Sequence, residues 1–280
     1  MSENHQRGIP AIDTAFARAA QEGRAALIPY LTVGYPTPDR TPELVRALIA
    51  GGADIIELGV PFSDPVADGP TIQAASYAAL RQGVTPATCL QTVRTLRDEG
   101  VETPILLMGY YNPILSFRHG PDAATGSPAA YAAACRASGV DGLIVPDLPP
   151  EEADGLSAAC HAEGLALVYL VAPTTGEARI AALCAATSGF LYVVRRLGTT
   201  GADAGGLDRR DALAASLAAV RRHARTPVAL GFGVSTPQQA AEAAALADGV
   251  IVGSAIVERA DAGADALRDY VGELRGALVR

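Results

Sequence analysis

Short, continuous hydrophobic runs recur along the chain and alternate with longer, alanine-rich segments. Unbroken apolarity, as opposed to strict alternation, is typical of a strand whose two faces are both buried in a parallel sheet. The segments between the runs are each long enough for a helix of about three turns. Strands are predicted at Ala26–Thr32, Asp54–Leu58, Pro104–Met108, Gly142–Val145, Leu165–Val171, Phe190–Val194, Val228–Leu230 and Gly249–Val252.

Helices are predicted between these strands and at both ends of the chain. An alternation of eight strands with helices over 280 residues predicts an α/β fold, a (β/α)8 or TIM barrel, whose usual length is about 250 residues. We expect one domain over residues 1–280, a flexible N-terminus over 1–8, and extended loops after strands 2 and 6. The predicted helices include Ile9–Glu22, Thr41–Ala50, Ala129–Ser138, Glu151–Glu163, Asp211–Ala224, Pro237–Ala245 and Asp265–Val279.

A doubly wound open sheet shows the same alternation and is the structural alternative. That fold usually has fewer strands and carries a glycine-rich fingerprint after the first one. Here the first strand is followed by Thr-Val-Gly-Tyr-Pro-Thr-Pro, which is not a dinucleotide-binding turn. The barrel is therefore the favoured prediction.

Composition excludes several classes of protein. The formal net charge of −8 argues against nucleic acid as a partner, because phosphate backbones require basic surface. No apolar run approaches the roughly 20 residues of a membrane span, and Met1–Gly8 does not resemble a signal peptide. The four cysteines lie in predicted helices without metal-binding or redox spacing, so we expect buried thiols in a cytoplasmic protein.

All 22 basic residues are arginine. Without lysine, the chain cannot form a Schiff base or hold pyridoxal phosphate covalently. The four histidines show no spacing that would predict a zinc site. The sequence thus predicts acid–base chemistry without a cofactor or metal in this chain.

Carboxylates gather directly after the second predicted strand. Glu57 ends that strand, and Asp68 lies on the following loop, which is stiffened by prolines. In a barrel the carboxyl ends of the strands form the active site, and apolar surroundings would raise the pKa of Glu57 there. The alternatives are that Glu57 forms a strand-end ion pair and that Asp68 caps the helix beginning near Pro70.

Glycines gather after the last three predicted strands. They occur at Gly198–Gly201, at Gly231-Phe-Gly233-Val-Ser235 and at Gly253-Ser254. Loops after strands 7 and 8 commonly bind phosphate through backbone N–H groups in barrel enzymes. The alternative is that these glycines only make tight turns. Three clusters together favour a phosphorylated substrate.

The segment Glu57-Leu-Gly-Val-Pro-Phe-Ser-Asp-Pro-Val-Ala-Asp-Gly-Pro-Thr-Ile-Gln73 closely resembles the signature of tryptophan synthase α subunits. Further motifs similar to that family follow in the expected order across nearly the whole chain. They are Leu-Met-Gly-Tyr-Tyr-Asn-Pro at 107–113, Val-Pro-Asp-Leu-Pro at 145–149, Gly-Phe-Gly-Val-Ser at 231–235 and Val-Gly-Ser-Ala-Ile-Val at 252–257.

The resemblance implies cleavage of indole-3-glycerol phosphate into indole and glyceraldehyde 3-phosphate, with Glu57 and Asp68 as the catalytic pair. It also implies a pyridoxal-phosphate β subunit as partner, with this chain holding no cofactor itself. By the same resemblance, substrate contacts are expected at Tyr30, Tyr110, Tyr192, Thr200, Gly201, Phe232, Gly233, Gly253 and Ser254. The implied partner surface comprises Pro61, Asp64, Pro65, Asn112 and Pro149.

Two segments depart from the family pattern. Arg195-Arg196-Leu-Gly-Thr-Thr-Gly replaces the usual sequence of the loop after strand 6, and residues 117–128 are longer than the usual connection. These departures keep open the hypothesis of a stand-alone lyase that releases free indole without a β partner. A separate hypothesis is a non-catalytic protein that activates a β subunit, against which the presence of Glu57 and Asp68 argues. An unrelated phosphate-binding barrel, such as an isomerase, is a further alternative.

Overall fold

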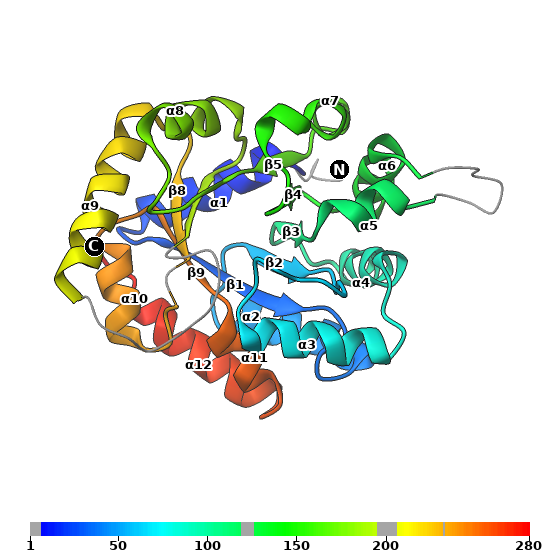
Figure 1. The fold of residues 1–280 in the computed structure, drawn as a ribbon. Helices are drawn as coiled ribbons and strands as arrows, with labels where there is room; N and C mark the ends of the chain where they lie inside the picture. Colours follow the sequence, from blue (N-terminus) through cyan, green and yellow to red (C-terminus); the bar gives the residue numbers. More distant parts are fainter. Residues whose placement is uncertain (1–6, 119–125, 195–205, 232) are drawn as a thin grey trace, which may run out of the picture.

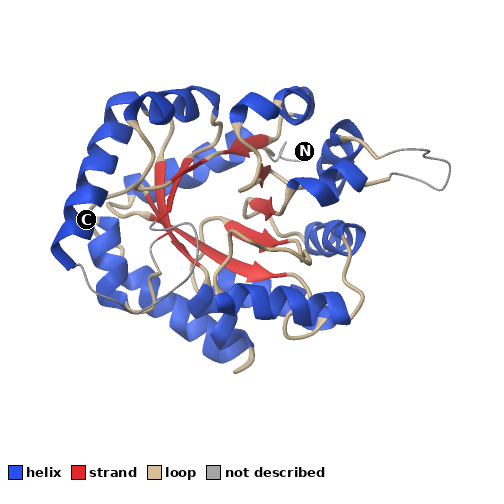
Figure 2. Ribbon diagram, in the orientation of Figure 1, coloured by secondary structure: helices blue, strands red, loops and turns tan. Residues whose placement is uncertain are grey.

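A parallel barrel lies at the centre of the molecule, and helices form a ring around it (Figure 1, Figure 2). The computed structural model describes residues 7–118, 126–194, 206–231 and 233–280, with only the helical backbone over residues 206–212. The strands are β1 (Ala26–Thr32), β2 (Ile56–Gly59), β3 (Ile105–Met108), β4 (Gly142–Ile144), β5 (Ala166–Val168), β6 (Leu170–Val171), β7 (Leu191–Val194), β8 (Val228–Gly231) and β9 (Gly249–Val252).

The predicted barrel is confirmed, with one strand interrupted. The strands follow the order β5-β4-β3-β2-β1-β9-β8-β7-β6, and every pairing is parallel. The two outer strands of this order are consecutive in the chain, and only Tyr169 separates them. Its carbonyl accepts a hydrogen bond from the Tyr192 N–H at 3.0 Å. β5 and β6 are therefore two halves of the predicted fifth strand. The first half pairs with β4 and the second half pairs with β7.

The predicted helices are present, and Thr41–Ala50 has the predicted bounds. The larger differences include the start of the helix predicted at Asp211, which begins five residues earlier, and that of the helix predicted at Glu151, which begins three residues later. Two 3₁₀ turns, η1 (Pro38–Arg40) and η2 (Pro150–Glu152), lie among them. The α-helices are α1 (Ile9–Gln21), α2 (Thr41–Ala50), α3 (Pro70–Arg81), α4 (Pro86–Asp98), α5 (Tyr111–Ser116), α6 (Pro128–Ser138), α7 (Asp154–Glu163), α8 (Glu177–Ala186), α9 (Gly206–His223), α10 (Pro237–Ala244), α11 (Ser254–Ala260) and α12 (Ala264–Gly276).

Helix α1 closes the amino-terminal end of the barrel. Its buried face, which includes Ile12 and Phe16, packs against the inward-facing side chains of the strands. A Cβ on Gly249, the first residue of β9, would lie 2.9 Å from the Phe16 ring. Residues 1–6 of the expected flexible segment lie outside the described residues. The Gly8 N–H just before α1 donates to buried Asp141 at 2.7 Å.

Side chains alternate between the barrel interior and the surrounding helices along each strand. On β2, Ile56 and Leu58 pack in the outer core beneath the helices, whereas Ile55, which directly precedes β2, belongs to the inner core closed by α1. The period of two then places Glu57 on the same inner side, one layer nearer the carboxyl end. The alternation that builds the core thus directs this carboxylate into the barrel.

A repeated contact at the amino-terminal end fixes the strands in register. At four places, a polar residue that lies shortly before one strand makes two hydrogen bonds to a residue near the start of the preceding strand position. The backbone N–H of the polar residue donates to the carbonyl of that strand residue. The side-chain oxygen of the polar residue accepts the N–H of the same strand residue, at 2.8–2.9 Å. The pairs are Asp54 with Leu27, Asp141 with Ile105, Ser188 with Leu167, and Asp248 with Val228.

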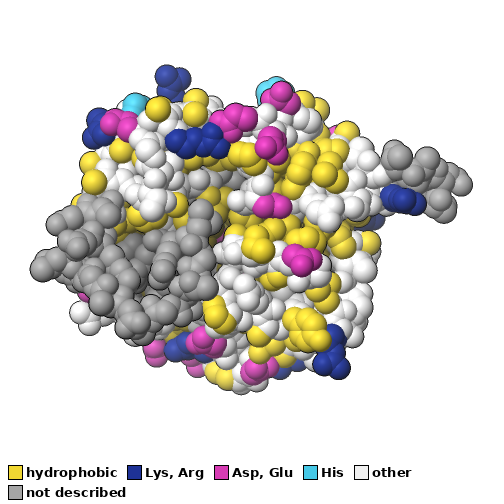
Figure 3. Space-filling view, viewed as in Figure 1, with side chains coloured by type: hydrophobic (Ala, Val, Ile, Leu, Met, Phe, Trp, Pro, Cys, Tyr) yellow, Lys and Arg dark blue, Asp and Glu magenta, His cyan; other side chains and the backbone are white. Residues whose placement is uncertain are grey.

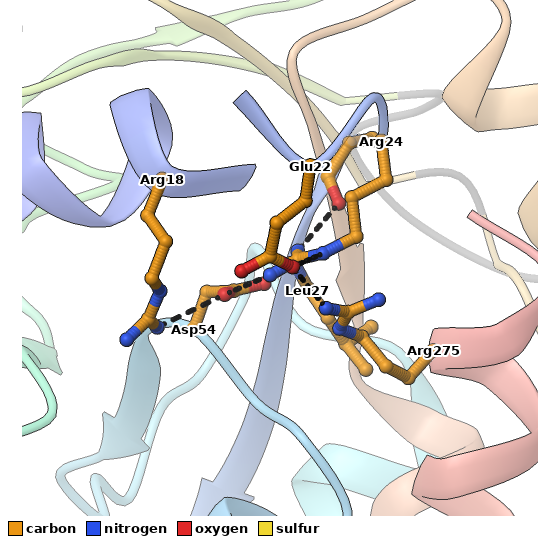
Figure 4. A network of polar contacts seen from close by, with 7 residues as sticks. Arg18, Glu22, Arg24, Leu27, Asp54 and Arg275 are labelled. Atoms are coloured by element: carbon orange, nitrogen blue, oxygen red, sulfur yellow. Dashed lines mark hydrogen bonds and ion pairs between the residues drawn. The ribbon is translucent and has the colours of Figure 1, made fainter. Parts of the chain in front are cut away.

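Asp54 is the centre of the largest of these contacts (Figure 4). Its carboxylate receives both Nη atoms of the buried Arg24 at 2.5 and 2.7 Å, besides the Leu27 N–H. Arg18 of α1 adds a bond at 3.1 Å. Glu22 joins Arg24 to Arg275 of α12, so this network connects both terminal helices to the first two strands.

The expectation for the cysteines is confirmed. Cys89, Cys135, Cys160 and Cys184 are all buried and free, on α4, α6, α7 and α8. Among the described residues, no helix combines the length and the apolarity that crossing a membrane requires.

Asp54→Asn should lower the free energy of unfolding by about 3 kcal/mol, because it removes the buried carboxylate of the Arg24 ion pair and leaves the half-exposed Glu22 as the charged partner of this guanidinium. Asp248→Asn is a matched control, since Asp248 makes the same strand contact with its side chain half exposed. We expect about 1 kcal/mol there. Urea unfolding of both variants measures the difference, and equal costs would contradict the importance of the Arg24 pair.

Candidate active site

Glu57 lies inside the barrel as the second residue of β2. Its register partners are Tyr30 on β1 and Leu106 on β3. The side chain is 1% exposed, and neither carboxylate oxygen has a hydrogen-bond partner among the described residues. The alternative of a strand-end ion pair therefore finds no support in the described structure.

Burial controls the protonation of Glu57. Removal from water disfavours the charged carboxylate, and the nearby charge of Asp68 disfavours it further. Together they raise the pKa of Glu57 to about 8. The carboxyl group is therefore mainly protonated at neutral pH and can act as an acid.

Asp68 lies on the loop between β2 and α3. The Tyr110 hydroxyl donates to its Oδ2 at 3.0 Å. Burial raises the pKa of Asp68 to about 6, and the bond from Tyr110 opposes this rise. The alternative that Asp68 caps α3 is wrong, because Gly69 is the N-cap residue and no side chain caps this helix.

Tyr110 joins the carboxylate loop to the end of β3. Its ring stacks on Phe62 with 5.0 Å between the centroids, and its oxygen accepts the Ala67 N–H at 2.9 Å. The same hydroxyl thus contacts the loop backbone and the Asp68 carboxylate. Tyr110 fixes where Asp68 points, besides contributing an aromatic surface.

Tyr30 and Tyr192 each lean across to the neighbouring strand and lie over a glycine. A Cβ on Gly59 would lie 2.0 Å from the Tyr30 oxygen, and one on Gly231 would lie 2.4 Å from the Tyr192 ring. The pKa of each phenol is well above its ordinary value, mainly through burial and then through the charges of both carboxylates. The two rings therefore flank the carboxylate pair inside the barrel.

The expected phosphate contacts are only partly described. Gly233 is exposed with φ +67°, and a Cβ there would meet nothing within 4 Å. Gly253 is the N-cap residue of α11, and Ser254 begins this helix. Thr200, Gly201 and Phe232 lie outside the described residues, as do Arg195 and the middle of the segment 117–128.

The expected partner residues lie on three connections at the carboxyl ends of the strands. Asp64 and Asn112 are exposed, Pro65 and Pro149 are half-buried, and Pro61 is buried. Asp147 accepts the Tyr111 N–H at 3.0 Å, which holds the connection after β4 against the start of α5. Figure 3 shows hydrophobic side chains gathered on the viewed face of the molecule.

Several contributors to the site were missed by sequence reasoning. Gly59 provides the space for the Tyr30 ring, and Gln73 donates to the carbonyl of Asp68 at 2.9 Å. Gly231 was expected only in a phosphate-binding glycine cluster, and its place beneath the Tyr192 ring was not foreseen. For Gly59, its place two residues after Glu57 was an available signal, because that spacing puts both on the inner side. No local pattern revealed the role of Gln73, which depends on the path of the loop.

Taken together, the described side chains form a proton donor next to a proton acceptor. Glu57, with a pKa of about 8, is mainly protonated near neutral pH, whereas Asp68, with a pKa of about 6, is mainly ionised. Two carboxyl groups whose environments separate their pKa values are a common basis of acid–base catalysis. Within the described ranges, no group of three or more His, Cys, Asp or Glu side chains could hold a metal ion.

Comparison with known proteins agrees with this geometry. The family model of the tryptophan synthase alpha chain matches residues 16–276. The chain is 47% identical to the tryptophan synthase alpha chain of Chloroflexus aurantiacus, covering 96% of this chain and 98% of that one. It is 46% identical to that of Halorhodospira halophila, with 94% of each covered.

Solved structures show the same relationship. A chain of Mycobacterium tuberculosis tryptophan synthase superposes with a TM-score of 0.85 at 38% identity, covering 96% of this chain and 98% of that one. Tryptophan synthase subunit alpha of Legionella pneumophila gives 0.83 at 35% identity, with 96% and 98% covered. The chain therefore belongs to the tryptophan synthase alpha chain family, whose place is in tryptophan biosynthesis.

Proposed function

We propose that this protein is a carbon–carbon lyase that cleaves indole-3-glycerol phosphate into indole and glyceraldehyde 3-phosphate. The observation that carries the proposal is Glu57, which is buried inside the barrel without a partner and faces an ionised Asp68. An acid held protonated near neutral pH is what protonation of an indole ring requires.

Glu57 first protonates the indole ring at C3, which places positive charge on the ring. Asp68, ionised and held by Tyr110, accepts the indole N–H and stabilises that charge. Glu57, now a carboxylate, removes the proton of the hydroxyl on the adjoining glycerol carbon. The electrons of the O–H bond form the aldehyde, the carbon–carbon bond breaks, and its electron pair restores the neutral ring. Glu57 ends protonated, as it began.

The aromatic side chains and the glycine turns would orient the substrate. Tyr30, Tyr110 and Tyr192 surround the carboxylates and offer flat apolar surfaces to an indole ring. Gly233, Gly253 and Ser254 follow β8 and β9, where backbone N–H groups can bind a phosphate. Such a phosphate contact would anchor the glycerol chain above Glu57.

We further propose that the protein works with a tryptophan synthase β subunit, which would hold the pyridoxal phosphate. Mycobacterium tuberculosis tryptophan synthase, to which the chain is similar, supports such a partner. The exposed Val66 and Leu115 lie on the loop after β2 and on α5, next to the expected contacts Pro65 and Asn112. Four buried, free cysteines are compatible with a reducing compartment such as the cytoplasm.

The rate of cleavage should depend on pH in a bell-shaped manner. Activity requires Asp68 ionised and Glu57 protonated, so kcat/KM should fall below about pH 6 and above about pH 8. Glu57→Gln should lower kcat about a thousandfold, and Asp68→Asn about a hundredfold. Steady-state indole release measures both. No indole from the parent protein, or full activity of Glu57→Gln, would contradict the proposed reaction.

Glu57 should also make stability depend on pH. Its folded pKa is raised from 4.5 to about 8, so its stabilising contribution is complete below pH 4.5 and is lost as the pH rises through 8. The free energy of unfolding of Glu57→Gln, which keeps a neutral group, should therefore exceed that of the parent by roughly 5 kcal/mol at pH 9. Near pH 5 the two proteins should differ little. Urea unfolding across this range measures the effect, and parallel curves for the two proteins would contradict it.

Addition of a β subunit should raise the rate of indole formation at least tenfold, because docking on the loop after β2 acts next to Asp68. The control is Asp64→Arg, an exposed substitution on that loop that should weaken the stimulation and spare the basal rate. Full activity without any partner would instead favour a stand-alone lyase. Activity of the complex that is unchanged by Glu57→Gln would instead favour a non-catalytic activator of the β subunit.

A further inference from the structure

Helix α3 presents two polar side chains, Gln73 and Ser76, to the loop that carries Asp68. They are three residues apart and thus lie on the same face of the helix. The buried Ser76 hydroxyl accepts the Phe62 N–H at 2.9 Å and donates to the Phe62 carbonyl at 3.0 Å. The start of the loop is therefore attached to α3 through both backbone groups of one residue.

Gln73 attaches the other end of the same loop. Its Nε2 donates to the Asp68 carbonyl at 2.9 Å and to the Pro65 carbonyl at 3.3 Å. The Pro65 carbonyl also accepts the Asp68 N–H at 3.0 Å, which closes the turn between these residues. One amide group thus contacts the backbone on both sides of this turn.

Tyr110 contacts the opposite side of Asp68. Gln73 binds the backbone carbonyl of Asp68, whereas the Tyr110 hydroxyl binds its carboxylate at 3.0 Å. The loop has little hydrophobic burial of its own here, since Val66 is 75% exposed. The direction of the Asp68 carboxylate therefore depends on these two polar contacts.

We propose that Gln73 is a positioning residue that holds the Asp68 carboxylate against Tyr110 and toward the reacting indole. This inference rests on the proposed lyase function. Gln73 does not itself reach the barrel interior, because its side chain is exposed and contacts only the loop backbone. Its effect on the reaction is transmitted through Asp68.

A displacement of the Asp68 carboxylate should be visible in the pH profile, because the groups around it influence its pKa. The titratable groups that face it are Glu57 on β2, Tyr30 on β1, Tyr110 after β3 and Tyr192 on β7. Of these, Tyr110 donates the bond that lowers the pKa of Asp68. If Asp68 loses the Tyr110 bond but stays buried, its pKa, and with it the acidic limb of the pH profile, should shift upward.

The test is Gln73→Met, which keeps the length of the side chain and removes its donor. We expect kcat to fall about tenfold with KM nearly unchanged, because the substrate still binds while Asp68 is misplaced. The acidic limb of kcat/KM should move up by roughly half a pH unit. Thermal unfolding should stay close to the parent, since the replaced side chain is exposed.

Gln82→Met is the matched control. Gln82 follows α3 directly, and its Nε2 donates to the carbonyls of Gly34 and Pro36 on the loop after β1. It makes the same kind of contact to a loop that carries neither carboxylate. The control variant should leave kcat and both pH limbs unchanged.

A double-mutant cycle with Tyr110→Phe tests the mechanism. If Gln73 acts by holding Asp68 against Tyr110, the combined variant should lose much less activity than the product of the two single effects. Multiplicative losses, an unshifted acidic limb, or an equal loss in Gln82→Met would each overturn the inference. Absence of indole from the parent protein would instead overturn the proposed function.

Discussion

The register of the eight strand positions is the constraint on which the rest of the molecule depends. It is set at the amino-terminal end by four polar residues. Each lies shortly before one strand and bonds to the backbone near the start of the preceding strand position; they are Asp54, Asp141, Ser188 and Asp248. A shift of one residue would exchange inward and outward side chains along a whole strand. Glu57 would then face the outer core instead of the barrel interior. The polar contacts at one end of the barrel therefore decide which groups meet at the other end.

The two ends of the barrel bury carboxyl groups in opposite surroundings. At the amino-terminal end, Asp54 is surrounded by guanidinium and N–H donors, and its charge is fully compensated. At the carboxyl end, Glu57 is equally buried but has no partner among the described residues. Burial of an uncompensated carboxyl group costs stability, and the proposed function of Glu57 as a reactive acid would account for this cost. Under that proposal, the groups that stabilise the fold and the groups that react lie at opposite ends of the barrel axis.

The sequence predicted the strand positions well, because they depend on local pattern, and the structure places Glu57 and Asp68 close together inside the barrel. Their catalytic roles stay a prediction. The continuous apolar runs indicated the strand positions, and Glu57 was predicted to face the barrel mouth from its place at the carboxyl end of the second strand. The break at Tyr169 could not be predicted, since it arises because the fifth strand pairs with β4 in its first half and with β7 in its second half. The contact of Asp68 with Tyr110, and of Gln73 with the loop, joins residues whose proximity depends on the folded path. Thr200, Gly201 and Phe232 stay predictions, because they lie outside the described residues.

Tyr30 packs over Gly59, and Tyr192 packs over Gly231. This packing limits which substitutions the carboxyl-terminal end of the barrel can accept during evolution. Neither glycine can accept a larger side chain while its tyrosine keeps its place, because a Cβ would overlap the phenol. A smaller residue in place of either tyrosine would leave a void above a bare backbone. Each ring and its glycine therefore form an epistatic pair, in which one substitution becomes tolerable only after the other. New substrate preferences in this barrel are expected to arise through such coupled substitutions. The single variants that lie between the two functional sequences should be less stable than either of them.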